Sequence, residues 1–462
     1  MRHLEDDTIM APFHKKESLT RKAPASSPPN VCGLMLIGVL TFLCEWNTAD
    51  TIDVEPQKEV YIPDYSIYHN LTSIQKDVQQ LLFRYPNFMK IDWKYNSRLG
   101  KPQMLLHITN FTLNTDPNQK VGRKVKMLLS YGEHAREFFP VESMFHLLRN
   151  LTGGLRSTPG SYEEVYSRHV LSSTDLHIIV MANPDGRVHV EHSHNYCWRG
   201  TSTGVDLNRN FDWEYAKKGS SADPNDEEYR GPHAFSEPEC TVYKHLTQEL
   251  HFDLFISFHS GIRQIYLPFA DTHSHNINRQ PANIRSIKEL AARLASSTRH
   301  KYQYGKAMDL TFYTADGTSF DYMAGQRKIP FSLAIELWGS ATHVGASCFD
   351  QFNPRSEDLK HETAEIHPLY VALFDYMIHW KHRRSNKPTD TLITKQHLQP
   401  LQGPTPSHTF GYLLMATVVI VIIILAFQGR LLFCQRWQHR RRIISLKTLS
   451  STLSLWGFVK SI

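Results

Sequence analysis

Val125-Lys-Met-Leu-Leu-Ser-Tyr131 is a short apolar run, and Gly132-Glu-His134-Ala-Arg-Glu137 follows it directly. The apolar run is typical of a buried central β-strand. The H-x-x-E spacing places an imidazole and a carboxylate on one side of a helical turn, so both can reach one cation. This spacing alone is weak evidence, because it also occurs in the basic N-terminal segment.

Other segments of the chain repeat the same strand pattern and alternate with helical periodicity. We expect strands at 125–131, 176–181, 254–258 and 331–337, and helices at 141–151, 237–250, 283–299 and 362–380. Strands interleaved with helices predict an α/β fold in which helices cover both faces of a largely parallel sheet. No internal repeat or long linker interrupts 66–380, so one domain is the simplest interpretation.

A third residue that can bind a metal ion stands at the end of another predicted strand. The segment Phe255-Ile-Ser-Phe-His259 brings one histidine to the edge of the sheet. Ligands of α/β folds collect at the carboxyl ends of strands. Two histidines and one carboxylate, His134, Glu137 and His259, form a zinc site that leaves the fourth position open, as in catalytic rather than structural sites.

Two further segments supply groups suited to catalysis. Glu336 is a single carboxylate within the apolar strand 331–337, and burial of an unpaired carboxylate is costly unless a cation or a reaction uses it. The segment 204–211 contains Asp206, Asn208 and Arg209, and Arg199 precedes it. Such side chains bind a carboxylate and stabilise a developing oxyanion.

These residues resemble, in chain order, the zinc metallocarboxypeptidases of the carboxypeptidase A type. The resemblance runs through G-E-H-A-R-E at 132–137, N-P-D-G at 183–186, W-R at 198–199, G-V-D-L-N-R-N-F at 204–211, F-H-S at 258–260, Tyr313 and the strand A-I-E-L at 334–337. It covers essentially all of 66–380. The overall layout looks most like the membrane-anchored zinc carboxypeptidase-like proteins of plants and protists.

The resemblance implies a three-layer α/β/α fold around a central mixed, largely parallel sheet, with one Zn²⁺ per chain. It implies that His134, Glu137 and His259 hold the zinc, and that Asp206 orients His134. Glu336 is then the general base, and Arg199 stabilises the oxyanion. By the same resemblance, the residues that bind the substrate, a peptide or protein C-terminus, are Arg136, Asn208, Arg209, Tyr313 and Phe320.

Specificity follows from the positions that the family uses to line its side-chain pocket. Phe320 falls at the bottom of that pocket, and Ala270 lies at another pocket position. Neither side chain offers the acidic partner that a basic C-terminal residue needs. We therefore expect a preference for hydrophobic or aromatic C-terminal residues, although Phe320 can equally be a core residue that contacts no substrate.

Charge and hydropathy indicate a membrane anchor rather than a nucleic-acid partner. The formal net charge of +6 comes from the tail Arg430–Ile462, which has seven Lys/Arg and no acidic residue, so the rest of the chain is close to neutral. Residues 410–427 are apolar and uncharged, long enough to cross a bilayer. The basic residues after them place that tail in the cytoplasm.

The predicted organisation has five parts. Residues 1–49 form a basic segment with a signal peptide or signal anchor at 31–43, 50–382 the lumenal or extracellular enzyme, 383–409 a stalk, 410–427 the transmembrane helix and 428–462 the cytoplasmic tail. The catalytic domain of this single-pass protein of the secretory pathway or cell surface then faces the lumen or exterior. Sequons at Asn70, Asn110 and Asn150 agree with this topology.

Three cysteines, Cys197, Cys240 and Cys348, lie in the predicted lumenal part, so at most one intramolecular disulfide forms there, and spacing does not decide which pair. Two alternative functions stay open. The first is a catalytically silent, carboxypeptidase-like binding ectodomain, although the chain keeps all four residues of the ligand set and the base. The second is a zinc amidohydrolase of the aspartoacylase type, which shares H-x-x-E but needs a different carboxylate-binding set.

Overall fold

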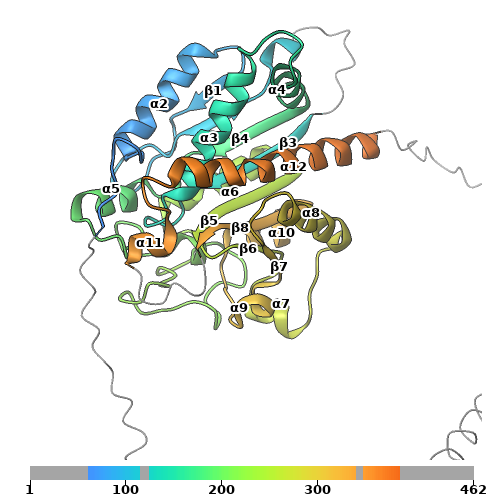
Figure 1. The fold of residues 1–462 in the computed structure, drawn as a ribbon. Helices are drawn as coiled ribbons and strands as arrows, with labels where there is room; N and C mark the ends of the chain where they lie inside the picture. The colour runs from blue at the N-terminus through green and yellow to red at the C-terminus, as the bar shows by residue number, and fades with distance from the viewer. Residues whose placement is uncertain (1–60, 115–123, 340–346, 386–462) are drawn as a thin grey trace, which may run out of the picture. The chain divides into compact units, whose positions relative to one another are not determined.

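The computed structural model describes residues 61–114, 124–339 and 347–385, which form an α/β unit around one sheet (Figure 1). The sheet has eight strands in the order β1-β2-β4-β3-β5-β8-β6-β7. Their bounds are β1 Met89–Asp92, β2 Leu105–Ile108, β3 Val125–Tyr131, β4 Thr174–Ile179, β5 Leu254–Gly261, β6 Gln264–Tyr266, β7 Gln303–Gly305 and β8 Phe331–Gly339. The four central strands β4, β3, β5 and β8 are parallel to one another. On one side β2 is antiparallel to β4 and β1 to β2, and on the other side β6 is antiparallel to β8 and parallel to β7.

Helices connect the strands and cover the sheet. Their bounds are α2 Leu71–Arg84, α3 Phe139–Gly154, α4 Tyr162–Ser173, α5 Pro184–Ser193, α6 Thr241–Glu249, α7 Thr272–Asn276, α8 Ile284–Ser296, α9 Ala307–Thr311, α10 Ser319–Gly325, α11 Cys348–Phe352 and α12 Leu359–Ser385. Three short 3₁₀ turns are η1 Phe111–Asn114, η2 Leu207–Arg209 and η3 Pro238–Cys240.

Alternation of side chains along the central strands creates two separate apolar cores. In β3, Met127 and Leu129 pack into the core beneath α3 and α12, whereas Leu128 packs with Tyr243 of α6 on the other face. The core under α3, α8 and α12 is the larger, and α10 joins α6 on the opposite face. This arrangement confirms the expected three-layer α/β/α fold with a mixed sheet.

The four strands expected from the sequence are the four parallel central strands. The bounds of β3 agree residue for residue, β4 begins and ends two residues earlier than expected, and β5 and β8 extend farther at their carboxyl ends. The helix expected over 237–250 is instead η3 followed by α6, because the chain starts at Pro238 with a 3₁₀ turn. The outer strands β1, β2, β6 and β7, of which β1 and β7 form the edges of the sheet, were not expected.

The turn after β3 places the motif G-E-H-A-R-E, residues 132–137, at the edge of the sheet. Gly132 has a positive φ of +71°, and a Cβ there would lie 2.6 Å from the sulfur of Met181. Only glycine satisfies both conditions without strain. The chain can therefore turn sharply as it leaves β3 and deliver His134 and Glu137 beside the end of the neighbouring strand β5.

Cys197 and Cys348 form a disulfide with a Cα–Cα distance of 5.1 Å, and Cys240 is buried and free. The bond joins the segment before Arg199 to the start of α11 across a sequence separation of 151 residues. The sequence had left this pairing open.

No helix within 61–114, 124–339 and 347–385 combines the length and apolar character needed to span a bilayer. The predicted span 410–427, the apolar segment 31–43 and the basic tail all lie outside the described residues. Helix α12 continues to Ser385, so the first residues of the predicted stalk are helical.

Candidate metal centre and active site

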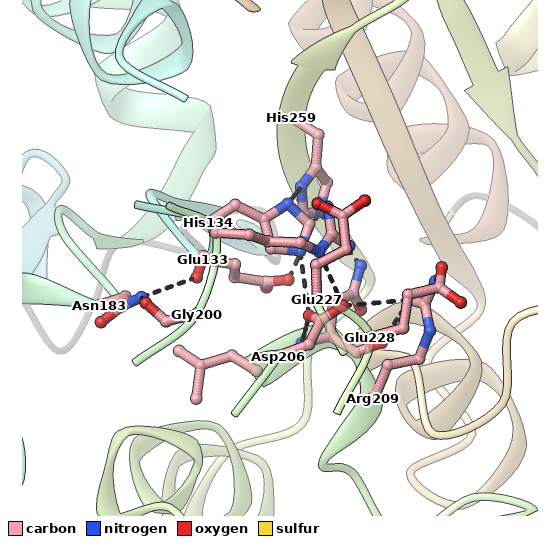
Figure 2. Close-up of polar contacts among 12 residues, drawn as sticks. Glu133, His134, Asn183, Gly200, Asp206, Arg209, Glu227, Glu228 and His259 are labelled. Atoms are coloured by element: carbon pink, nitrogen blue, oxygen red, sulfur yellow. Dashed lines mark hydrogen bonds and ion pairs between the residues drawn. The ribbon is translucent and has the colours of Figure 1, made fainter. Parts of the chain in front are cut away.

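Three side chains predicted to bind a metal converge at the carboxyl edge of the central strands. His134 and Glu137 follow β3, and His259 lies near the end of β5. Figure 2 shows His134 and His259 close together. The Nδ1 atom of His134 lies 2.6 Å from Oε1 of Glu137 and 3.1 Å from Nδ1 of His259. The Nδ1 atom of His259 lies 3.1 Å from Oε2 of Glu137. All three are at most 3% exposed.

This cluster fits a divalent cation better than it fits a purely structural network. Two imidazole nitrogens that approach one another and the same carboxylate present three ligand atoms around one point, all within 4.8 Å of one another. Without a cation, the buried Nδ1 atoms of His134 and His259 face each other at 3.1 Å. Two histidines and one carboxylate are the ligands that catalytic zinc uses, with a remaining position open for solvent or substrate.

Glu336 of β8 stands beside this cluster. Its Cα is the register partner of His259 in the parallel β5–β8 pair, so both side chains point to the same face of the sheet. Its Oε2 is buried and has no hydrogen-bond partner in the described part of the chain. Burial raises the pKa of Glu336 to about 7, and the charge of Glu137 adds to this rise. A carboxylate oxygen without a partner at this position can exchange a proton with a bound molecule.

Asp206 connects the metal cluster to the arginines. It is fully buried, and its Oδ1 lies 3.2 Å from Nε2 of His134, the ring nitrogen that faces away from the cluster. Its Oδ2 accepts a hydrogen bond of 2.8 Å from Nε of Arg199. Burial opposes ionisation of Asp206, but the charges of Arg199, His134 and Arg209 hold its pKa well below the usual range. The ionised carboxylate can thus fix the tautomer of His134.

The remaining polar residues predicted to bind substrate lie next to this group. Asn208 is within η2, and its Nδ2 lies 3.4 Å from Nε2 of His259. The Arg209 guanidinium donates to Oε1 of Glu228 at 2.7 Å, and that of Arg136 donates to Oε2 of Glu227 at 2.7 Å. Figure 2 shows Glu228 beside Arg209 and Glu227 above Asp206.

Tyr313 and Phe320 have contrasting positions. Tyr313 is 51% exposed and follows α9, whereas Phe320 in α10 is buried in the core that includes α6. The exposed tyrosine can change its orientation, while Phe320 packs within the protein. Tyr313 is half-exposed but close enough to Arg209 and Glu336 to interact with their charges. The structure therefore brings together the polar residues predicted for the site: His134, Glu137, His259, Glu336, Asp206, Arg199, Asn208, Arg209, Arg136 and Tyr313.

The sequence did not single out three acidic residues of the site. Glu133 is buried with its Oε2 3.4 Å from Nε2 of His259, and its Oε1 accepts a hydrogen bond of 2.9 Å from Tyr243. The only sequence feature that could have pointed to Glu133 is its position directly before His134. Glu227 and Glu228 belong to the loop that follows the 204–211 motif, and nothing in the spacing pointed to them.

Comparisons with known proteins agree with this geometry. The zinc carboxypeptidase family profile matches residues 74–366. Zinc carboxypeptidase A 1 of Anopheles gambiae is 27% identical over 286 residues, which are 59% of this chain and 60% of that protein. A zinc carboxypeptidase of Simulium vittatum is 30% identical over 47% of this chain and 71% of its own length. The chain spans 60% of the length of the Anopheles gambiae protein and 63% of that of carboxypeptidase A1 of Rattus norvegicus, which is less than two thirds in both cases.

Solved structures show the same fold. Carboxypeptidase A from Helicoverpa armigera matches with a TM-score of 0.56 and 22% identity, covering 68% of this chain and 75% of its own. Bovine thrombin-activatable fibrinolysis inhibitor matches with a TM-score of 0.56 and 20% identity, covering 69% and 99%. By its profile match and its relatives, this chain belongs to the zinc carboxypeptidase family, which implies one zinc ion per chain.

Proposed function

We propose that the protein is a zinc-dependent metallocarboxypeptidase that hydrolyses the last peptide bond of peptides or proteins. The observation that carries this proposal is the convergence of His134, Glu137 and His259 next to Glu336, whose buried Oε2 has no partner in the described part of the chain. His134, Glu137 and His259 would hold the zinc ion. The ion supplies Lewis acidity and lowers the pKa of water.

The protein's own residues supply proton transfer and charge stabilisation. Glu336 accepts the proton of the attacking water and returns it to the leaving amine, because its side chain lies on the same face as His259 and its Oε2 has no hydrogen-bond partner among the described residues. Asp206 holds His134 in one tautomer through the ring nitrogen that faces away from the cluster. Arg199, fixed by Asp206, offers its remaining N–H groups to the negative charge that develops on the carbonyl oxygen.

The exopeptidase character comes from side chains that bind a free carboxylate. Asn208 and Arg209 provide an amide and a guanidinium next to the metal cluster, and exposed Tyr313 can close over the bound end of a substrate. Arg136 assists farther out. In the structure Arg209 and Arg136 pair with the carboxylates of Glu228 and Glu227, which supports the proposal that both guanidinium groups can bind a substrate carboxylate.

Glu228 competes with the substrate for Arg209, which leads to a kinetic prediction. Because Glu228 is 40% exposed, it can swing away, but only by giving up its ion pair. We expect Glu228→Gln to lower KM by about fivefold, since an exposed pair contributes up to about 1 kcal/mol. Steady-state kinetics of peptide hydrolysis measure the change. Glu227→Gln releases the more distant Arg136 in the same way and should lower KM less than Glu228→Gln does. A higher KM for Glu228→Gln contradicts the competition.

A hydrophobic or aromatic C-terminal residue is the expected substrate preference. Phe320 and Ala270 are both buried and apolar and lie in the same core, and neither offers a negative charge to a basic side chain. Release rates from matched peptides that end in Phe, Leu, Lys or Glu test this prediction. We expect Phe and Leu to leave fastest, whereas fastest release of Lys would refute the preference.

We also propose that the protein is tethered to a membrane by residues 410–427, with 428–462 in the cytoplasm and the enzyme facing the lumen or cell exterior. The support is the uncharged apolar composition of the first segment and the Lys/Arg content of the second. Protease treatment of sealed microsomal vesicles tests this topology: a tag within 61–114 should be protected in the lumen, whereas a tag at residue 462 should be digested, and the reverse result would contradict the proposal.

The test of the proposed activity is zinc content together with amino-acid release by the purified full chain. We expect one catalytic zinc ion and release of single residues from peptides with a free C-terminus, but none from the same peptides with a C-terminal amide. Bound zinc without hydrolysis of a broad peptide panel would instead favour a silent binding ectodomain.

A further inference from the structure

A second cluster of metal-binding side chains lies at the opposite end of the sheet from the proposed zinc site. Asp175 and His177 are two residues apart in β4, and His107 of β2 is the register partner of His177. Side chains two residues apart in a strand share a face, and register partners stand side by side. Asp175 also pairs with Lys126 at the start of β3, whereas the catalytic motif follows the end of that strand.

The ligand atoms of these three residues lie within 4.8 Å of one another. Oδ1 of Asp175 is hydrogen-bonded to Nε2 of His107 and lies 3.5 Å from Nε2 of His177. The two imidazole rings are stacked with their centroids 4.2 Å apart. The terminal torsion of histidine is broad, so small rotations can aim both Nε2 atoms at one ion beside the carboxylate.

The burial of His177 is a second observation that points to a metal site. His177 is only 6% exposed, and its Nε2 has no hydrogen-bond partner among the described residues, the nearest carboxylate oxygen being Oδ1 of Asp175 at 3.5 Å. Such a buried ring nitrogen normally finds a partner. The rings of Phe252 and Phe111 pack against His177 and His107, so an apolar wall surrounds the imidazoles. The His107 side chain is 32% exposed and leaves the cluster open to solvent on one side.

Two lysines near Asp175 carry positive charges that oppose metal binding. Lys124 donates to Thr109 and Asn110, whereas the ion pair with Asp175 is made by Lys126. Its Nζ lies 3.3 Å from Oδ2 of Asp175, on the side of the carboxylate away from the imidazole contacts. Because this side chain is 29% exposed and flexible, it can move toward solvent when a cation approaches. Its charge weakens the site but leaves Oδ1 available.

From this geometry we propose that His107, Asp175 and His177 form a second zinc site, separate from the proposed catalytic centre. The two imidazoles and one carboxylate provide three ligands, and the exposed side leaves room for water to complete the coordination. An ion there would tie β2 to β4 in a part of the sheet where the strands are only four and six residues long.

Zinc titration of the full chain, stripped with a chelator, tests this proposal. We expect two zinc equivalents in the native sequence. His134→Asn weakens only the catalytic equivalent, whereas His107→Asn and His177→Asn each weaken only the other. Lys126→Met tightens that second equivalent by about tenfold, because it removes a positive charge beside a ligand near the surface. Circular dichroism shows whether each variant is folded.

Lys126→Met and His107→Asn keep the test decisive even if His177→Asn fails to fold, since both residues are partly exposed. The inference is overturned if the native chain takes up a single equivalent that His134→Asn removes. The inference is also overturned if a second zinc equivalent binds with the same affinity in His107→Asn and in Lys126→Met as in the native chain. Peptide hydrolysis does not enter these measurements, so they are independent of the proposed activity.

Discussion

Replacing Glu336 by glutamine is expected to reduce kcat for peptide hydrolysis by about 10²- to 10⁴-fold, the usual contribution of a positioned general base. The amide has nearly the same shape as the carboxylate but cannot accept a proton from water. Because Oε2 of Glu336 makes no hydrogen bond, the exchange removes no structural contact of that atom. Single-turnover assays with enzyme in excess over peptide measure the residual rate of hydrolysis.

Zinc content separates loss of the base from loss of the metal. Glu336 is beside the cluster but is not one of its three ligands, so the Gln variant should keep its zinc ion. Glu357→Gln, the same change at an exposed site, is the matched control and should leave kcat unaltered. A Glu336→Gln variant with zinc bound and nearly full kcat would mean that another group takes the proton.

The features that the sequence predicted well are those set by local composition. The central strands are short apolar runs because both of their faces are buried, and their carboxyl ends carry His134 and His259 because ligands of parallel sheets collect there. The outer strands β6 and β7 have only three residues each and depend on pairing with their neighbours, which no local pattern encodes.

The acidic partners of the arginines escaped prediction for a different reason. Glu227 and Glu228 sit between Ser221 and Tyr229, which form an isolated β-bridge, and this loop closure brings the two carboxylates back to Arg136 and Arg209. Such a contact depends on how the loop folds over the sheet edge. The spacing of residues in the sequence predicts the motif residues of the site, but it does not predict the loop contacts that Glu227 and Glu228 make with Arg136 and Arg209.

The largest combined loss of stability and zinc affinity is expected for Asp206→Ala. Asp206 is fully buried, and its carboxylate serves His134, Arg199 and the backbone N–H of Asn208 at 2.8 Å. Its removal leaves the guanidinium of Arg199 buried without its charged partner, which costs about 3–5 kcal/mol of unfolding free energy. Chemical denaturation of the zinc-free protein measures this loss.

The same substitution should weaken zinc binding, because nothing then fixes which nitrogen of His134 carries the proton. Loss of such an orienting partner typically lowers metal affinity by about 10- to 100-fold. Asp185→Ala is the matched control, since Asp185 is also buried but binds the neutral donors Ser97 and Leu99. It should lose stability yet keep its zinc affinity. If Asp206→Ala binds zinc as tightly as the native chain does, the carboxylate stabilises only the arginines, and His134 owes its orientation to the packing around it.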